Sequence, residues 1–159
     1  MAGTFFISIK GKKQGEFKAE SGKNPSNIPI FGFSYGVTSP RDPASGLATG
    51  RRQHKPITIY KEWGVASVQM FEALVTNEVL TPVTIREIRT GPTGKEEPYM
   101  EIRLTNASIS AIQIDPQRLD DAPVWTDHET EMVSFTFQKI EIENFLSNSA
   151  ASDDWEARV

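Results

Sequence analysis

The 159-residue sequence contains no cysteine and only two histidines, His54 and His128. Without cysteine the chain forms no disulfide framework and no thiolate zinc site, and it has no cysteine nucleophile. Two histidines far apart in the sequence supply at most half of a histidine-rich metal site. The sequence also contains no G-x-S-x-G motif, and neither histidine is flanked by residues that suggest a Ser-His-Asp set. We therefore expect a protein that is not an enzyme and that carries no metal or cofactor.

The sequence also has no excess of basic residues and no long apolar run near its N-terminus. Lys and Arg total 17 against 21 Asp and Glu, which gives a net charge of −4. Such a chain is poorly suited to coating nucleic acid, because phosphate neutralisation requires a basic face. The apolar run near the N-terminus extends only from Phe5 to Ile7, and no positive region precedes it. We expect neither membrane insertion nor a cleavable signal peptide.

Leucine is scarce, whereas residues branched at Cβ are abundant. The sequence has 14 Ile, 9 Val and 13 Thr but only 6 Leu. Branching at Cβ restricts χ1 in helices and packs well on a pleated sheet, so this composition predicts a mainly β fold. The length is that of one domain, which we assign to residues 1–159.

Alternation of apolar and polar residues predicts most of the strands. The patterns predict strands at residues 4–10, 31–37, 57–62 and 82–89. The segment GPTGKEEP, residues 91–98, is predicted to be a hairpin loop. Residues 99–114 form one long apolar run whose phase changes, so this segment is expected to be bent or bulged, or covered on both faces. In the last strand, 132–145, the phase changes at Gln138 and Lys139, where we predict a bulge. The tail at about 146–159 is polar and is assigned no strand.

One helix is predicted, capped by Ser67 and ending near Thr76. Its apolar side chains fall at spacings of three and four and form one stripe, made by Val68, Phe71, Leu74 and Val75. A stripe of this kind normally faces the core, so we expect it to pack on the sheet.

The predicted strand at 31–37 has two dissimilar faces. The apolar face, which we expect to be buried, consists of Phe31, Phe33, Tyr35 and Val37. The opposite face has almost no side chains, because it consists of Gly32, Ser34 and Gly36. This small face suits close approach by another backbone, or a smooth wall. The alternative is a twisted strand in which the glycines relieve curvature.

Two further segments carry opposite charge. Residues 39–56 show neither periodicity and concentrate basic side chains, namely Arg41, Arg51, Arg52 and Lys55. A loop of this length inside a compact domain is usually functional or disordered. The polar tail concentrates acidic side chains, namely Asp153, Asp154 and Glu156. Opposite charges on separate protruding segments favour head-to-tail association, although two unrelated solvated segments would give the same pattern.

Segments along the whole chain share the pattern of a known family. The most specific is FSYGVTSPRDPASGLATGRRQHKPITIYKEWGVAS, residues 33–67. The others are FFISIKGKKQGEF near the start, NASISAIQI and EMVSFTFQKIEIE in the predicted strands, and DDWEAR in the tail. On these residues the chain resembles the haemolysin-coregulated protein family, Hcp, over essentially its full length.

The resemblance implies a compact two-sheet β-barrel with one flanking α-helix, similar to phage tail tube proteins. It implies a structural subunit of the type VI secretion tube, in which hexameric rings stack head to tail around a lumen that carries small effector proteins. Sheath and spike proteins are the other expected partners. The expected location is the bacterial cytoplasm before firing, and then the exterior or the target cell. The alternative function is a tail tube protein of a phage or another contractile particle.

The resemblance also implies roles for individual residues. Gly32, Ser34 and Gly36 look like part of the lumen wall, and residues 39–56 look like an extended loop that projects between subunits and rings. The candidates for inter-subunit or ring-stacking contacts are then Arg41, Asp42, Arg51, Arg52, Lys55, Asp153, Asp154 and Glu156. The competing class is a small hydrolase or ligand-binding β-barrel, which would need a convergent polar pocket.

Overall fold

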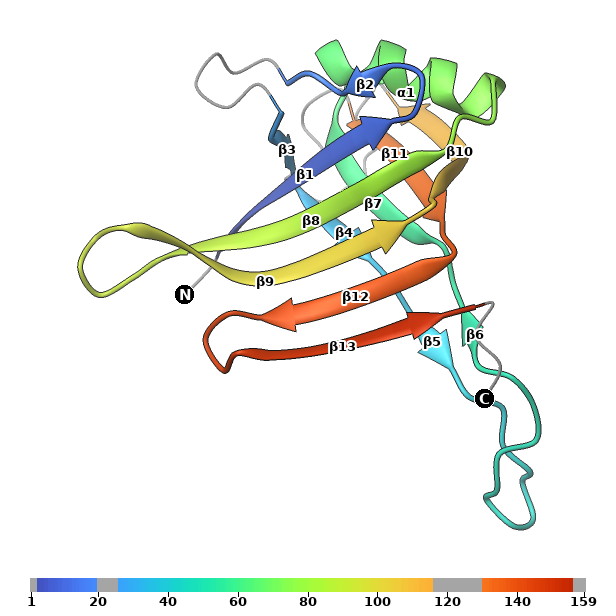
Figure 1. Ribbon diagram of the computed structural model, residues 1–159. Helices are drawn as coiled ribbons and strands as arrows, with labels where there is room; N and C mark the ends of the chain where they lie inside the picture. Colours follow the sequence, from blue (N-terminus) through green and yellow to red (C-terminus); the bar gives the residue numbers. More distant parts are fainter. Residues whose placement is uncertain (1–2, 20–25, 116–129, 156–159) are drawn as a thin grey trace.

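Two antiparallel sheets form the body of the protein in a computed structural model that describes residues 3–19, 26–115 and 130–155 (Figure 1). The larger sheet has the strand order β13-β12-β9-β8-β1-β2, with β3 also paired to β1. Its strands are β1 (Thr4–Gly11), β2 (Gly15–Glu16), β3 (Ile28–Ile30), β8 (Leu80–Thr90), β9 (Glu96–Thr105), β12 (Lys139–Asn144) and β13 (Ser149–Asp154).

The smaller sheet has the strand order β10-β11-β7-β4. Its strands are β4 (Gly32–Ser34), β7 (Ile57–Glu62), β10 (Ser108–Asp115) and β11 (Thr130–Thr136). Two short strands, β5 (Val37–Thr38) and β6 (Gln53–His54), pair with each other outside both sheets. Helix α1 (Val65–Val75) lies at the top of the body in Figure 1.

The core lies between the apolar faces of the two sheets. Ile7, Ile85 and Leu104 of the larger sheet and Ile59 and Val133 of the smaller one are among its buried side chains. Full burial of a side chain of this size contributes about 1.5–3 kcal/mol. Most of the buried side chains on the strands are Ile or Val, which confirms the mainly β fold predicted from composition.

The chain passes directly from one sheet to the other at Phe31, at Asn106 and again near Gln138. Chain segments that bend from one sheet into the other are typical of orthogonal sheet packing. Among the described residues the hydrogen-bonded ladders form separate sheets and not one closed cylinder. The expected two-sheet architecture with one helix is therefore confirmed, without closure of the barrel.

These corners explain the phase changes in the sequence. The run at 99–114 bends at Asn106, whose φ of 49° lies in the left-handed region. Strand β10 has a further register shift between Ile109 and Ala111. The predicted bend is confirmed. The bulge predicted at Gln138 is wrong in kind, because the chain there leaves β11 for β12 in the other sheet. A segment that changes sheets must also change the side on which its apolar residues lie.

Helix α1 differs from the prediction in its start and in its buried face. It begins at Val65, and the Ser67 hydroxyl accepts a hydrogen bond from the backbone N–H of Gly64 at 2.9 Å. Its buried residues are Ala66, Ser67, Met70 and Ala73. The predicted stripe is wrong, since Val68 is 74% and Phe71 61% exposed. The buried stripe has the same period as the predicted one but lies on another face of the helix. Its alanines, Ala66 and Ala73, are small and let the helix approach the body closely. Within the described part of the chain, no helix is long and apolar enough to span a bilayer.

Two other segments depart from their predictions. The strand expected at 31–37 is divided between β4 and β5, and Phe31 and Val37 are exposed although we expected them to be buried. The polar tail contains β13, which pairs with β12 along its whole length from Ser149 to Asp154. An edge strand needs no continuous apolar face, so its small polar residues gave no alternating signal. The strand at 57–62 is confirmed as β7, and the loop at 91–98 contains the turn between β8 and β9.

Candidate assembly surfaces

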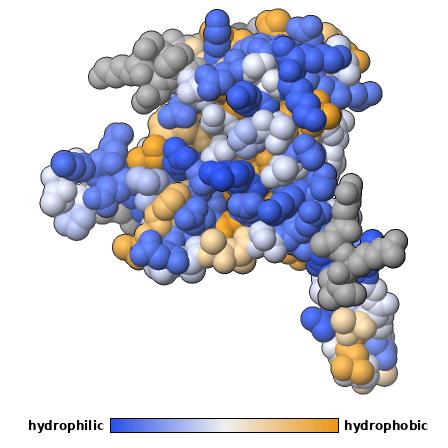
Figure 2. All heavy atoms as spheres, in the orientation of Figure 1, coloured by the Kyte–Doolittle hydropathy of each residue, from blue (hydrophilic) through white to orange (hydrophobic). Residues whose placement is uncertain are grey.

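Residues 37–55 form a projecting hairpin, which we call the arm. Val37 and Thr38 of β5 pair with His54 and Gln53 of β6, and an isolated bridge joins Arg41 to Ala48 further out. Figures 1 and 2 show the arm extending well away from the body. The segment predicted as a long aperiodic loop is therefore a hairpin with short ladders.

The end of the arm is a closed turn organised by Asp42. The Asp42 carboxylate accepts hydrogen bonds from the Ala44 backbone N–H at 3.0 Å and from the Ser45 hydroxyl at 2.8 Å. These bonds, led by the one from Ala44, lower the pKa of the Asp42 carboxyl. The Asp42 backbone N–H donates to the Leu47 carbonyl at 2.8 Å. The turn leaves the Leu47 side chain 69% exposed.

The base of the arm is attached to β13 through one carboxylate. Arg52 Nε donates to Asp153 Oδ2, and Arg52 Nη2 donates to the Asp154 carbonyl at 3.2 Å. Nε2 of His54 lies 2.6 Å from the same Asp153 oxygen. The hydrogen bond from Arg52 and, less strongly, that from His54 lower the pKa of the Asp153 carboxyl.

The imidazole of His54 is enclosed by aromatic side chains. Its Nδ1 lies 2.6 Å from the Tyr35 hydroxyl, and its ring centroid lies 5.0 Å from that of Trp155. The side chain is only 4% exposed. Burial, followed by the negative charge of Asp153, raises the pKa of Tyr35. We call the five residues that hold the arm the anchor cluster: Tyr35, Arg52, His54, Asp153 and Trp155.

The anchor cluster is built to fasten the arm. Tyr, His and Asp are groups that can transfer protons, but both ring nitrogens of His54 are engaged by Tyr35 and Asp153. Within the described ranges, no group of three or more His, Asp or Glu side chains is arranged to hold a metal ion. What this arrangement can do is fix the direction in which the arm projects.

The structure separates the charged candidates into different environments. Arg52 and Asp153 contact each other within one chain, so their opposite charges join the arm to the body. Arg41 and Arg51 are exposed on the arm. Lys55 lies beside Gly36, where its Cδ would be 3.3 Å from an added Cβ. Glu156 lies outside the described residues, as does His128.

Sequence reasoning missed the anchor cluster because its members are distant in the sequence. From the sequence, His54 is considered only for a metal site or a Ser-His-Asp set, and Asp153 is predicted to contact another subunit, with a solvated tail as the alternative. The available signal was the aromatic Trp155 directly after two acidic residues in an otherwise polar segment. That signal gives no indication of which earlier residues the segment meets.

The outer face of the smaller sheet carries small hydroxylated side chains. Gly32 and Ser34 of β4 lie on this face, and an added Cβ at Gly32 would contact nothing within 4 Å. Cross-strand pairing continues the row from Ser34 to Thr58 and then to Ser134. The Thr58 and Ser134 hydroxyls lie 2.9 Å apart. At the level of Ser34 the small face predicted on one strand thus extends over three strands, whereas Gly32 pairs with Tyr60 and Gly36 lies beyond β4 at the base of the arm.

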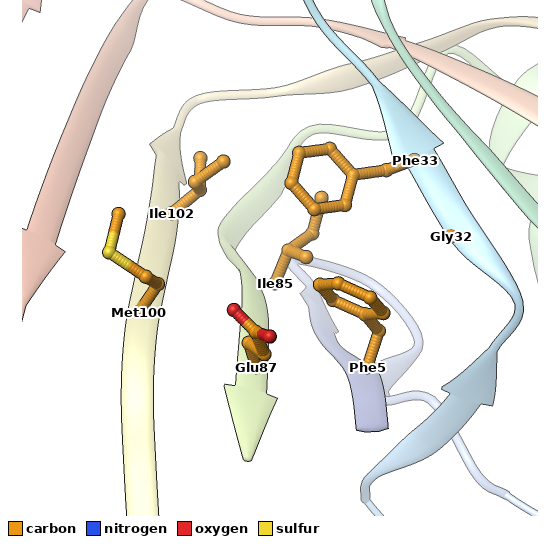
Figure 3. Close-up of a pocket in the computed structure, with 7 residues that line it drawn as sticks. All are labelled: Phe5, Gly32, Phe33, Ile85, Glu87, Met100 and Ile102. Carbon is orange, nitrogen blue, oxygen red and sulfur yellow. The ribbon is translucent and has the colours of Figure 1, made fainter. Parts of the chain in front are cut away.

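An apolar pocket opens between the larger sheet and β4 (Figure 3). Its volume is about 420 Å³, and its lining consists of Phe5, Gly32, Phe33, Ile85, Glu87, Met100 and Ile102. The rings of Phe5 and Phe33 meet edge to face at 5.7 Å. Glu87 is the charged member of the lining, and its carboxylate lies 3.2 Å from Arg89 Nε. This lining lacks the convergent polar groups that a small hydrolase would need.

The comparisons with known proteins point to one family. Residues 6–143 match the family described as "Type VI secretion system effector, Hcp". The "Major exported protein" of Pseudomonas aeruginosa is 34% identical over 170 residues, covering 100% of this chain and 99% of that protein.

Solved structures agree in fold over nearly the whole chain. A structure described as "Crystal structure of Hcp protein" has a TM-score of 0.86 at 25% identity, covering 99% of this chain and 100% of the other. The secreted protein Hcp3 from Pseudomonas aeruginosa has a TM-score of 0.78 at 28% identity, covering 98% of this chain and 100% of the other.

Proposed function

The chain belongs to the Hcp family of the type VI secretion system, and we propose that it forms hexameric rings that stack head to tail into the inner tube. The observation that carries this proposal is the arm, which projects from the body and is held at its base by the anchor cluster. A rigid projection that meets a different surface on a second copy makes a heterologous contact, and such contacts generate rings and filaments.

We place the small face of the smaller sheet on the lumen of the tube. Ser34, Thr58 and Ser134 present short hydroxylated side chains there, and Gly32 presents none. A wall of this kind leaves room for cargo and offers hydrogen bonds without deep apolar pockets. In this arrangement small effector proteins contact Ser34 and Gly32, and Gly36 continues the wall toward the arm.

The remaining candidates serve contacts between copies. Arg41, Arg51 and Lys55 are the arm cations available for another subunit, and Asp42 and Asp154 contribute acidic groups beside them. Arg52 and Asp153 act indirectly, because they hold the arm in its direction. Sheath and spike proteins are the proposed partners of the assembled tube, which leaves the cell with its cargo.

Negative-stain electron microscopy of the pure protein at increasing concentration tests this proposal. We expect rings with an open centre, and stacks of rings as the concentration rises. A matched variant in which a two-residue turn replaces the arm end, residues 41–48, retains the β5–β6 pairing and should fail to stack. A monodisperse monomer at high concentration, measured by sedimentation, would contradict the proposal.

A further inference from the structure

Two exposed apolar features lie on different parts of the molecule. One is the apolar pocket whose lining includes Phe5, Phe33 and Met100 (Figure 3). The other is Leu47 at the end of the arm, where apolar surface is visible in Figure 2. We propose that the pocket of one subunit receives Leu47 of a second copy. This inference rests on the proposed tube function and names the surface that the arm meets.

The arm end is suited to enter a pocket. Its turn is closed by the hydrogen bonds of Asp42 to Ala44 and Ser45, so Leu47 is presented without further ordering of the backbone. Pre-organisation of this kind reduces the entropy lost on association. A pocket volume of about 420 Å³ lies within the range of sites that enclose ligand groups, and it exceeds what one leucine side chain fills.

Charge favours the same occupant. Arg41 is paired with Ala48 across the arm, and Ala48 is the residue that follows Leu47. In the proposed contact Arg41 therefore reaches the pocket mouth together with Leu47. Glu87 supplies a carboxylate in the pocket, where its side chain is 13% exposed and contacts Arg89. The apolar residue of the arm thus meets the apolar lining, and the arm cation meets the acidic group.

The donor of Leu47 must be another copy. The anchor cluster holds the arm so that it extends away from the strands that line the pocket, β1, β4, β8 and β9 (Figure 1). The contact therefore joins two different surfaces, and a contact of that type continues from copy to copy.

Cysteine cross-linking tests the contact, because the chain contains no cysteine of its own. The double variant Leu47→Cys with Met100→Cys should form disulfides between subunits on oxidation and give a ladder of multiples on a non-reducing gel. The control pairs Leu47→Cys with Ser147→Cys, which lies in an exposed turn outside the pocket, and should give no ladder. Mixing the Leu47→Cys and Met100→Cys single variants should give dimers.

Each outcome separates the contact from the tube itself. Rings or stacks without a ladder would overturn the pocket contact and leave the tube proposal standing, whereas absence of both would overturn both. A disulfide within one chain would show that the arm reaches its own pocket. Maleimide should label the cysteine of Met100→Cys at least tenfold more slowly in tubes than in monomers. Equal rates would overturn the proposed contact, because Leu47 of a second copy would then not cover the pocket.

Discussion

Asp153 Oδ2 lies 2.6 Å from Nε2 of His54, a residue 99 positions earlier in the sequence, and this contact joins β13 to the base of the arm. The same oxygen accepts a hydrogen bond from Arg52. One carboxylate therefore contacts two residues at the base of the arm, and it adds to the contacts that His54 makes with Tyr35 and Trp155.

Replacing Asp153 by Asn should lower the free energy of unfolding by about 1–2 kcal/mol. The substitution removes the charge that holds Arg52 and His54 but retains the size of the side chain. Hydrogen bonds to charged groups contribute about 1.5–3 kcal/mol, and the partial exposure of Arg52 and Asp153 reduces this value. Urea unfolding measures the change. The matched control is Glu143→Gln on β12, which should change stability by less than about 0.5 kcal/mol; equal losses would contradict the anchor.

The stability that Asp153 contributes should depend on pH. Its carboxyl has a lower pKa in the folded chain than in the unfolded one, because Arg52 and His54 donate to it. The contribution is therefore fully present above the unfolded pKa of about 3.9 and is lost as the pH falls through the folded pKa. The difference in unfolding free energy between the wild type and Asp153→Asn should shrink below about pH 4. A difference that stays constant down to pH values near 2 would rule out this explanation.

Two neighbouring arginines should respond differently to charge reversal. Arg51→Glu should lower tube formation and leave the free energy of unfolding within about 0.5 kcal/mol of the wild type, because Arg51 is exposed on the arm. Arg52→Glu should lower both, since it places a carboxylate against Asp153. Pelleting of tubes and urea unfolding, made on both variants, check this. Identical behaviour of the two variants would show that the anchor contact has no special role.

Ser34→Trp should leave the rings intact and weaken retention of effector. The indole would project from the outer face of the smaller sheet, where an added side chain at the neighbouring Gly32 meets open space. We expect cargo that co-purifies with the rings to bind about tenfold more weakly, equivalent to about 1.4 kcal/mol. Ser147→Trp, in the turn before β13, is the control. Unchanged retention in Ser34→Trp would remove this face from the lumen.

Local pattern predicted the elements better than it predicted their partners. Ile57 and Ile59 alternate with polar residues, and β7 has the predicted bounds. On α1 the period was right but the face was wrong: Met70 and Phe71 are both apolar, yet Met70 is buried and Phe71 is exposed. Periodicity gives the spacing of a stripe, whereas the choice between two stripes depends on packing.

The candidate site shows the same limit. The small residues Gly32 and Ser34 could be recognised in one strand, but Thr58 and Ser134 join them only through the order of strands in the sheet. His54 and Asp153 meet because β13 lies at the sheet edge beside the arm base. Neither relationship is encoded in neighbouring residues, so neither could be found from local sequence.

The separation of His54 from Asp153 also sets a sequence of events during synthesis. At about 5–20 residues per second, a ribosome makes Asp153 roughly 5 to 20 seconds after His54. Until then the arm lacks the carboxylate that fixes its direction. A nascent subunit therefore carries an arm that is complete in sequence before the carboxylate that holds its base has been translated.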